Sequence, residues 1–334
     1  MKVLFSHNIP FHLAHGGVQT QIEAIMSGLK ELGVEVEPEH WWDSTQTGDI
    51  IHFFGRPPFA SVVRLAKDKG MKTVMFENLD RTASRSSSKL FLQRWFIRLA
   101  KASLRGMVTR FAWDVYQELD AMIFVTDLER QTARYLFDAV EEREYVIGHG
   151  LTQEALSALS EPAAESDYLV YVATIAERKN TVLLAEAAHR AGVPVMFLGK
   201  PYAETDPYYR QFLKLVDQKL VRYPGYVTEE EKWRILREAR GFVLWSQFES
   251  GCIAVYEAAA SGLPMLLPDL PWASREYGKV DGVELVSPEQ PDLAVKKLSD
   301  FYSRSHRRSV PLFQIGTWKE VARRYLEVYQ SIVK

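Results

Sequence analysis

Two glutamates with a defined spacing give the clearest chemical signal in the sequence. Glu249 and Glu257 stand eight residues apart, just after the apolar run 242–245. That run is typical of a buried strand and the residues after 252 of a helix, so we expect Glu249 at a strand end and Glu257 two turns into the helix. At 1.5 Å per helical residue their carboxylates would lie roughly 10–12 Å apart. One acid could then hold sugar hydroxyls and the other ribose hydroxyls; the alternative is two solvated glutamates.

The segment between these glutamates is suited to binding phosphate. Gly251, Cys252 and Ile253 stand where the helix should begin. The first backbone N–H groups of a helix have no partner inside it, and they point with the positive end of the helix dipole toward any anion placed there.

Cations follow another predicted strand, 168–172. Arg178 and Lys179 come shortly after it, with Thr174 at the start of the same loop. Positive charge at a strand end can stabilise a diphosphate leaving group, whose negative charge grows as its bond to a sugar breaks. Taken alone, such a pair is more often part of a solvated loop.

A third candidate lies after the first strand. His15, Gly16 and Gly17 precede a predicted helix, and glycines let the backbone approach phosphate closely at a helix start. The pattern is not Gly-x-Gly-x-x-Gly, which disfavours a nicotinamide site, and a plain turn is the alternative.

Apolar runs alternate with helical patterns along both halves of the chain. This alternation predicts an α/β fold of two Rossmann-like, doubly wound parallel sheets, one in residues 1–155 and one in residues 160–312. Two such domains would face each other across a cleft. The predicted strands cover 2–6, 35–37, 50–54, 72–76 and 121–126 in the first half, and 168–172, 194–198, 242–245, 264–267 and 283–286 in the second.

The second half resembles retaining glycosyltransferase family 4 (glycosyltransferase group 1, GT-B fold). The resemblance rests on Glu249 and Glu257 with the Ala-rich helix and Gly262-x-Pro264 after them, on Lys179, and on the glycine pair near residue 16. It implies that Glu249 contacts the transferred sugar, Glu257 the ribose and Tyr226 the base. It also implies that a C-terminal helix over 317–334 completes the first domain. The family arginine is replaced here by Thr174, and Arg178 is the candidate to supply its charge.

The resemblance also implies an activity. A nucleoside diphosphate sugar, with UDP favoured, would give its sugar to a hydroxyl acceptor with retained configuration and without a metal or other cofactor. An inverting transferase, a nucleotide-sugar epimerase and a noncatalytic membrane-associated binding protein stay open as alternatives. Many family members carry a histidine after the fourth strand; here Glu77 and Asn78 stand nearby, as sugar or acceptor contacts or as ordinary loop residues.

A basic segment suggests where an acceptor could come from. Residues 81–113 contain eight lysines and arginines and no acid. Helical spacing puts four of them on one face, which predicts contact with anionic lipid and a lipid-linked or cell-envelope acceptor; a solvated helix or one binding a soluble anionic acceptor is the alternative. These four are Arg94, Arg98, Lys101 and Arg105.

Composition narrows the remaining classes. A net charge of −2 gives no general support to nucleic-acid binding, and the single cysteine excludes an internal disulfide framework. The scattered histidines predict no metal site. The start of the chain turns polar too early for a signal peptide, and no run of about 18 apolar residues occurs. We therefore expect a cytoplasmic protein, peripheral at the inner face of the membrane if the basic segment binds lipid.

Overall fold

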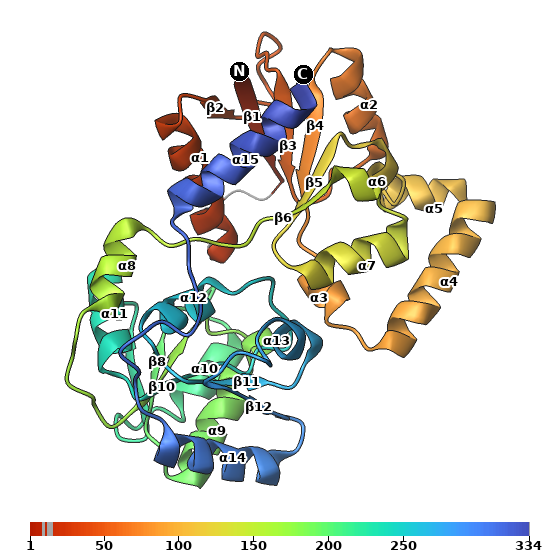
Figure 1. The fold of residues 1–334 in the computed structure, drawn as a ribbon. Coiled ribbons are helices and arrows are strands. Elements are labelled where there is room, and N and C mark those ends of the chain that lie inside the picture. Colours follow the sequence, from red (N-terminus) through yellow and green to blue (C-terminus); the bar gives the residue numbers. More distant parts are fainter. Residues whose placement is uncertain (9–10, 12–15, 334) are drawn as a thin grey trace. The chain divides into compact units, whose positions relative to one another are not determined.

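The computed structural model describes residues 1–8, 11 and 16–333. The chain divides into two compact units, Met1–Gly150 together with Trp318–Lys334, and Leu151–Thr317. Each unit contains a six-stranded, fully parallel sheet with helices packed on it (Figure 1). The expected class, two doubly wound α/β units, is confirmed.

The sheet of the first unit has the order β2-β1-β3-β4-β5-β6. This order reverses between β1 and β3, which makes their carboxyl ends a topological switch point. The strands are β1 (Lys2–His7), β2 (Glu35–Pro38), β3 (Ile50–Phe54), β4 (Lys72–Phe76), β5 (Ala121–Phe124) and β6 (Glu144–Val146). The helices are α1 (Gly17–Glu31), α2 (Ala60–Asp68), α3 (Asp80–Ala83), α4 (Ser87–Ser103), α5 (Arg105–Arg110), α6 (Val115–Glu118), α7 (Asp127–Phe137), the 3-10 helix η1 (Glu141–Arg143) and α15 (Trp318–Val333).

Strand residues of this unit alternate between two buried faces, as a covered parallel sheet requires. Leu4, Ile51 and Phe53 pack on one side with apolar residues of α2, α4 and α7. On the other side His52 donates to or accepts from the Tyr329 hydroxyl of α15 at 2.6 Å. Burial lowers the pKa of His52 to about 3, so its ring stays neutral at physiological pH.

The C-terminal helix α15 packs against α1 (Figure 1). A glycine permits the close approach: a Cβ atom on Gly28 would lie 2.6 Å from Cβ of Ala322. The last helix therefore belongs to the first unit, although its residues come last in the sequence.

The sheet of the second unit has the order β12-β11-β10-β7-β8-β9. Its switch point lies between β7 and β10, which pair directly. The strands are β7 (Leu169–Val172), β8 (Val195–Leu198), β9 (Val221–Gly225), β10 (Gly241–Val243), β11 (Met265–Pro268) and β12 (Val283–Val286). The helices are α8 (Gln153–Ser160), the 3-10 helix η2 (Glu177–Lys179), α9 (Thr181–Ala191), α10 (Pro207–Leu213), α11 (Glu229–Glu238), α12 (Ile253–Ala260), α13 (Pro271–Glu276) and α14 (Pro291–Arg304).

Sequence reasoning missed two strands, β6 and β9, both at sheet edges. Strand β9 contains Pro224 and Gly225, a pair that favours a turn, but an edge strand tolerates proline because one side of its backbone has no partner strand. In the described part of the chain, no helix has the length and apolar content needed to cross a membrane.

Candidate functional site

The strongest candidate site lies at the switch point of the second sheet. Loops leave the carboxyl ends of β7 and β10 there, and in open parallel sheets this is where ligands bind. The first loop carries Lys179 at the end of η2, and the second carries Glu249. Two motifs that lie 70 residues apart in sequence therefore meet at one edge of the sheet.

Lys179 and Glu249 form an ion pair through the lysine Nζ and a glutamate oxygen. Their side chains are only 8% and 9% exposed. A buried charge is costly unless it is paired, so each side chain satisfies the other in this structure. A polar ligand at this edge would contact one cation and one anion that are already largely desolvated.

Hydrogen bonds between the two loops fix the pair in place. The Asn180 side chain donates to the Trp245 carbonyl at 2.8 Å. The Gln247 amide donates to the carbonyl of Arg178 at 2.8 Å. Each bond joins a residue next to Lys179 to a residue shortly before Glu249. The two loops, and with them the ion pair, are therefore fixed relative to each other.

A glycine brings the loop after β8 against the loop after β7. Gly199 has φ +145°, and a Cβ atom there would lie 1.9 Å from the carbonyl oxygen of Ala173. Ile175 continues the contact by donating its amide to the Lys200 carbonyl at 3.1 Å. Only glycine fits this close approach, so Gly199 sets the path of the loop that carries Thr174 and Lys179.

The amino end of α12 follows Glu249 directly. Gly251 takes a left-handed φ of +52°, and the helix begins at Ile253 after Cys252, with no side-chain cap from the described residues. The Val255 N–H already donates to the Cys252 carbonyl at 2.9 Å, so an anion would be bound by the N–H groups that precede it and by the positive end of the helix dipole. Burial raises the pKa of Cys252 to about 12, so the residue stays a neutral thiol and adds no negative charge beside the helix end.

Glu257 lies on α12 and is 4% exposed. Its Oε1 atom is 2.7 Å from Nζ of Lys232 on α11, and the same Nζ is 2.8 Å from Oε2 of Glu229. Burial raises the pKa of Glu257, while the Lys232 charge opposes that shift. Burial disfavours charged Lys232 too, but its two acidic neighbours raise its pKa overall. Sequence reasoning missed Lys232, which lies among acids on a helix typical of a solvated face.

The remaining predicted residues of the second unit are partly or fully exposed. Arg178 is half-buried, with its guanidinium carbon 5.7 Å from the Phe248 ring centroid. Thr174 is half-buried in the loop after β7. The Tyr226 ring is 71% exposed and lies 5.1 Å from the Lys200 ammonium.

Glu77 in the first unit is a buried ion-pair residue rather than an exposed loop acid. Its Oε2 atom is 3.5 Å from Nε of Arg56 and accepts a hydrogen bond from the Tyr116 hydroxyl at 2.9 Å. Asn78 is half-buried and accepts the Asp80 amide at 3.2 Å. Arg56 and Tyr116 were not among the predicted residues, because both come from loops or helices far from Glu77 in sequence.

The glycine pair begins the first helix as expected. Gly16 is the N-cap of α1, with φ +145°, and Gly17 is the first helical residue. His15 lies outside the described residues.

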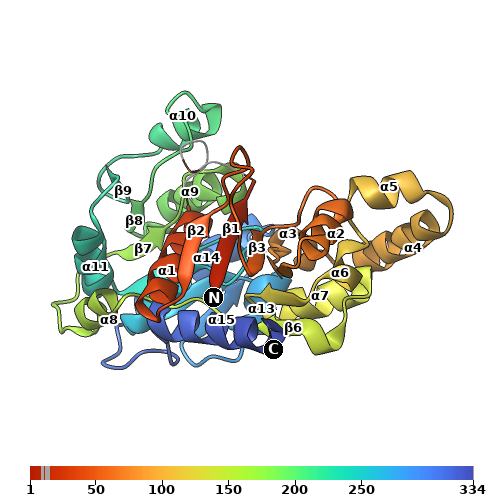
Figure 2. The ribbon, with the colours of Figure 1, turned by 90° about the horizontal axis from the view of Figure 1, so that it is seen from above.

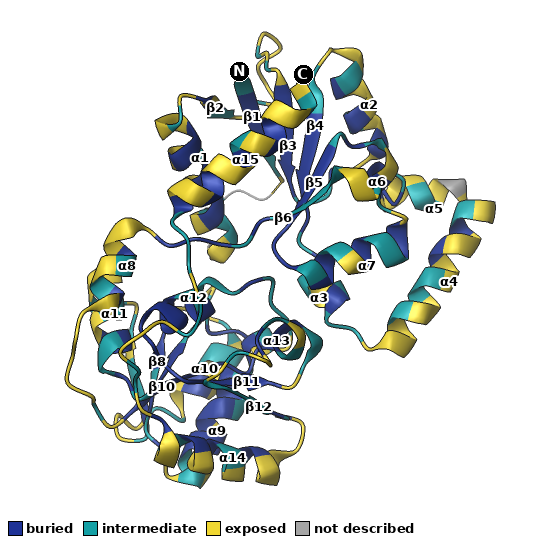
Figure 3. Cartoon of the chain, in the orientation of Figure 1, coloured by how far each residue is buried: buried dark blue, intermediate teal, exposed yellow. Residues whose placement is uncertain are grey.

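Helix α4 differs from the expected basic face. Arg94 places its guanidinium over the Tyr135 ring at 4.3 Å, and Lys101 pairs with Asp138 at 3.0 Å, so both turn toward α7 and its C-terminal end. Arg98 is exposed, and the side chain of Arg105 lies outside the described part of the structure. Residues along α4 are exposed (Figure 3). They include the large apolar side chains Phe91, Leu92, Trp95, Phe96 and Leu99, each 43–65% exposed.

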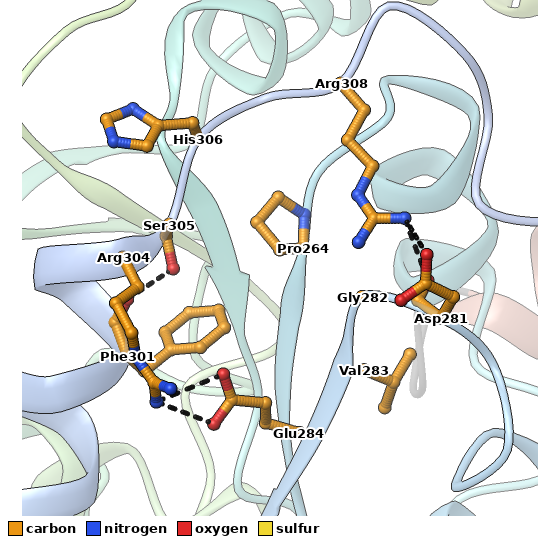
Figure 4. A pocket seen from close by; sticks show the side chains of 10 residues that line it. All are labelled: Pro264, Asp281, Gly282, Val283, Glu284, Phe301, Arg304, Ser305, His306 and Arg308. Atoms are coloured by element: carbon orange, nitrogen blue, oxygen red, sulfur yellow. Dashed lines mark hydrogen bonds and ion pairs between the residues drawn. The ribbon is translucent and has the colours of Figure 1, made fainter.

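A pocket of about 360 Å³ lies at the opposite edge of the second sheet, near the start of β11 and β12 (Figure 4). Its cations are paired with acids: Arg308 with Asp281 at 2.8 Å and Arg304 with Glu284 at 3.3 Å. Ligands of open α/β sheets bind at carboxyl ends, so this pocket is a weaker candidate than the Lys179–Glu249 edge. Within the described residues no cluster of three metal-ligating side chains occurs.

Comparison with known proteins also points to the second unit as the one that carries the functional site. Residues 153–310 match the family model described as "Glycosyl transferases group 1". The match lies within the unit Leu151–Thr317 and includes Lys179, Glu249 and Glu257. This unit is therefore similar to group 1 glycosyltransferases over most of its length, which supports the expected class of enzyme, a glycosyltransferase. No curated protein sequence gives a match to the chain.

Solved structures confirm the GT-B fold over the whole chain. A glycosyltransferase from Rickettsia africae superposes with a TM-score of 0.66 at 11% identity, covering 100% of this chain and 98% of that one. Sucrose-phosphate synthase from Thermosynechococcus elongatus gives 0.68 at 13%, covering 99% of each. HepE from Anabaena, solved with UDP and glucose, gives 0.63 at 12%, covering 99% and 100%.

Proposed function

We propose that this chain, whose residues 153–310 match the group 1 glycosyltransferase family model, transfers a sugar from a nucleoside diphosphate sugar to a hydroxyl acceptor with retention of configuration. One observation carries the proposal: the buried Lys179–Glu249 pair lies at the switch point of the second sheet. UDP is the favoured nucleotide, because a protein of the same fold was solved with UDP and glucose.

The donor would replace the internal ion pair with bonds to itself. Its diphosphate would lie at the uncapped start of α12, where helix N–H groups and the Lys179 ammonium both face negative charge. Glu249, released from the lysine, would accept hydrogen bonds from sugar hydroxyls. Glu257 would hold ribose hydroxyls, and Arg178 would add the positive charge that Thr174 cannot supply.

The same groups would promote bond breaking. As the bond from the sugar to the diphosphate lengthens, negative charge grows on the leaving oxygens. Lys179 and the α12 amides stabilise that charge without a divalent metal. The acceptor hydroxyl then attacks from the face that the diphosphate leaves, and a phosphate oxygen takes its proton, so the anomeric configuration is retained.

A binding panel followed by product analysis tests this proposal. We expect UDP or a UDP-sugar to raise the melting temperature, since a ligand at 100 times its Kd adds about 2.7 kcal/mol of stability. With an accepted sugar acceptor, NMR should show the donor's anomeric configuration in the product. Inverted product would indicate an inverting transferase, and a new nucleotide-sugar without acceptor would indicate an epimerase. Binding of no nucleotide-sugar would reject the proposal.

The acceptor class follows from the exposed face of α4. We infer that this face lies on an anionic membrane surface and that the acceptor is lipid-linked or a cell-envelope glycan. Phe91, Trp95 and Leu99 form an apolar stripe, while Lys89 and Arg98 are exposed beside it. An amphipathic helix of this kind inserts its apolar face into the headgroup region, and flanking cations bind anionic lipid at about 1 kcal/mol each. Figure 2 shows α4 and α5 at the outer end of the first unit, away from its sheet.

Liposome pelleting with matched variants tests the membrane surface. Leu92 on α4 and Leu65 on α2 are 65% and 60% exposed. Leu92→Glu should abolish pelleting with anionic vesicles because it puts an anion into the apolar face, whereas Leu65→Glu should pellet like the wild type. Equal effects of the two substitutions, or no pelleting of the wild type at low salt, would contradict the inference.

A further inference from the structure

Two adjacent tryptophans are among the most exposed apolar side chains of the first unit. Trp41 and Trp42 lie shortly after β2, which ends at Pro38, and are 84% and 68% exposed. Leaving two indole rings in water forgoes the burial free energy that large apolar side chains normally contribute to folding. An exposed apolar cluster of this kind usually marks a contact with another molecule.

The segment that presents these rings is held by hydrogen bonds. The His40 amide donates to Oε1 of Gln46 at 2.7 Å, and the Gln46 side chain donates to Glu37 at 2.8 Å. The His40 ring stacks on Trp42 with a centroid distance of 5.2 Å. The two indoles stand at 88° to each other, so they offer two aromatic faces in a corner.

The acidic residues around the two tryptophans disfavour an anionic membrane, the partner proposed for α4. Residues 35–49 contain five acids and no lysine or arginine. Lys2 pairs with Glu35 and Glu37, and the amino group of Met1 lies 3.9 Å from Asp49, which leaves a net negative charge on the segment. This charge would repel an anionic bilayer, which Lys89 and Arg98 on α4 would attract. Exposed Asp43, Ser44 and Thr45 instead provide carboxylate and hydroxyl groups beside the aromatic faces.

The position of the tryptophans points in the same direction. They follow the carboxyl end of β2, which pairs with β1 at the edge of the first sheet (Figure 1). Ligands of such sheets bind beyond the carboxyl ends of the strands. The group is thus on the side of the unit where a ligand is expected.

We propose that Trp41 and Trp42 form a binding site for the sugar rings of a neutral glycan. The C–H face of a pyranose ring is apolar and flat enough to stack on an indole, while its hydroxyls at the rim need polar partners. The corner of two indoles beside Asp43, Ser44 and Thr45 offers both. Resting on the proposed function, this site would hold the acceptor chain that receives the transferred sugar.

Fluorine NMR of the intact chain labelled with 5-fluorotryptophan tests the site. Signals of Trp41, Trp42 and Trp95 are assigned with Trp41→Phe, Trp42→Phe and Trp95→Phe. The probes are maltohexaose, cellohexaose and chitohexaose, added without nucleotide. We expect at least one to shift these two signals and not that of Trp95, and expect Trp41→Ala to weaken its binding about tenfold, the value of one lost stacking contact.

The same experiment separates the possible partners. Anionic vesicles should shift the Trp95 signal and leave Trp41 and Trp42 unchanged. Shifts of Trp41 and Trp42 with vesicles, or no shift with any of the three oligosaccharides, would overturn the proposal. Since no nucleotide is present, failure of the donor-binding panel leaves this outcome unaffected, and the two proposals fail separately.

Discussion

Both units hold a buried ion pair just beyond their strands, and the two pairs differ in how completely they are satisfied. In the first unit Glu77 accepts from both Arg56 and Tyr116, and Arg56 also donates to the Phe111 carbonyl at 3.2 Å. In the second unit the Lys179 and Glu249 side chains are joined by one hydrogen bond, and among the described residues they make no other. We call Arg56–Glu77, whose groups have several partners, the fixed pair, and Lys179–Glu249, joined by one bond, the exchangeable pair.

This difference indicates different roles. Separating a buried ion pair in which every group is hydrogen-bonded costs much free energy, because each charge loses several partners at once. A pair joined by one contact can exchange that contact for a ligand of matching charge. We infer that Arg56–Glu77 stabilises the fold and that Lys179–Glu249 separates to bind the donor.

Breaking the exchangeable pair should have the largest effect. Lys179→Ala and Glu249→Gln should each lower kcat about 1,000-fold, the effect of removing one group that stabilises developing charge. Each variant also leaves a buried charge without its partner, so its melting temperature should fall, and turnover is compared at a temperature at which both variants are folded. Lys214→Ala, at an exposed lysine of the same unit, is the matched control. Steady-state turnover decides; full activity in both variants would contradict the site assignment.

Breaking the fixed pair should instead unfold the protein more easily. Arg56→Met leaves Glu77 and Tyr116 buried without their cation, and should lower the free energy of unfolding by about 3–5 kcal/mol. Glu77→Gln together with Arg56→Met should recover part of that loss, because no uncompensated charge remains. Denaturant titration measures both. A stable Arg56→Met variant with impaired acceptor use would show that the cluster binds ligand after all.

The pair around Glu257 should give a smaller, pH-dependent effect. Lys232→Met removes the charge that opposes the raised pKa of Glu257. A carboxyl whose pKa is raised by folding binds its proton more tightly in the folded state, so stability falls as pH rises through and above its ordinary pKa. The variant should therefore lose about 2 kcal/mol at pH 8 and less at pH 5.

A double variant provides the control for that prediction. Lys232→Met with Glu257→Gln has no carboxylate to protonate at this position, so its stability relative to Glu257→Gln should be the same at both pH values. Chemical denaturation at pH 5 and pH 8 measures each difference. A loss in Lys232→Met that is equal at the two pH values would show that Lys232 acts only by packing.

The sequence was most informative where a single element decides the outcome. Strands β3 and β12 are short runs of apolar residues with a single polar residue in each, His52 and Glu284, so their bounds were predicted without knowledge of their neighbours. Strand β9 was missed because its proline and glycine are acceptable only at a sheet edge, and the edge is defined by the other strands.

Some residues of the candidate site could be predicted from the sequence and others could not. The motif residues Lys179 and Glu249 were expected at strand ends, and the structure brings them together. Lys232 could not be found, since its partner Glu257 lies on a different helix. The face of α4 was assigned wrongly because helical spacing groups residues without saying which group meets α7. The buried residues Ile97 and Ala100 decide that, and they turn Arg94 and Lys101 inward.

The placement of α15 has a consequence for synthesis. The second unit is complete at Thr317, where a bridge to Leu151 closes it, but the first unit still lacks the helix that covers His52 and the face of α1 around Gly28. Domains usually fold as units while the chain emerges from the ribosome. In this chain the later-made half can finish first, and the N-terminal half has to wait for the final 17 residues, Trp318–Lys334.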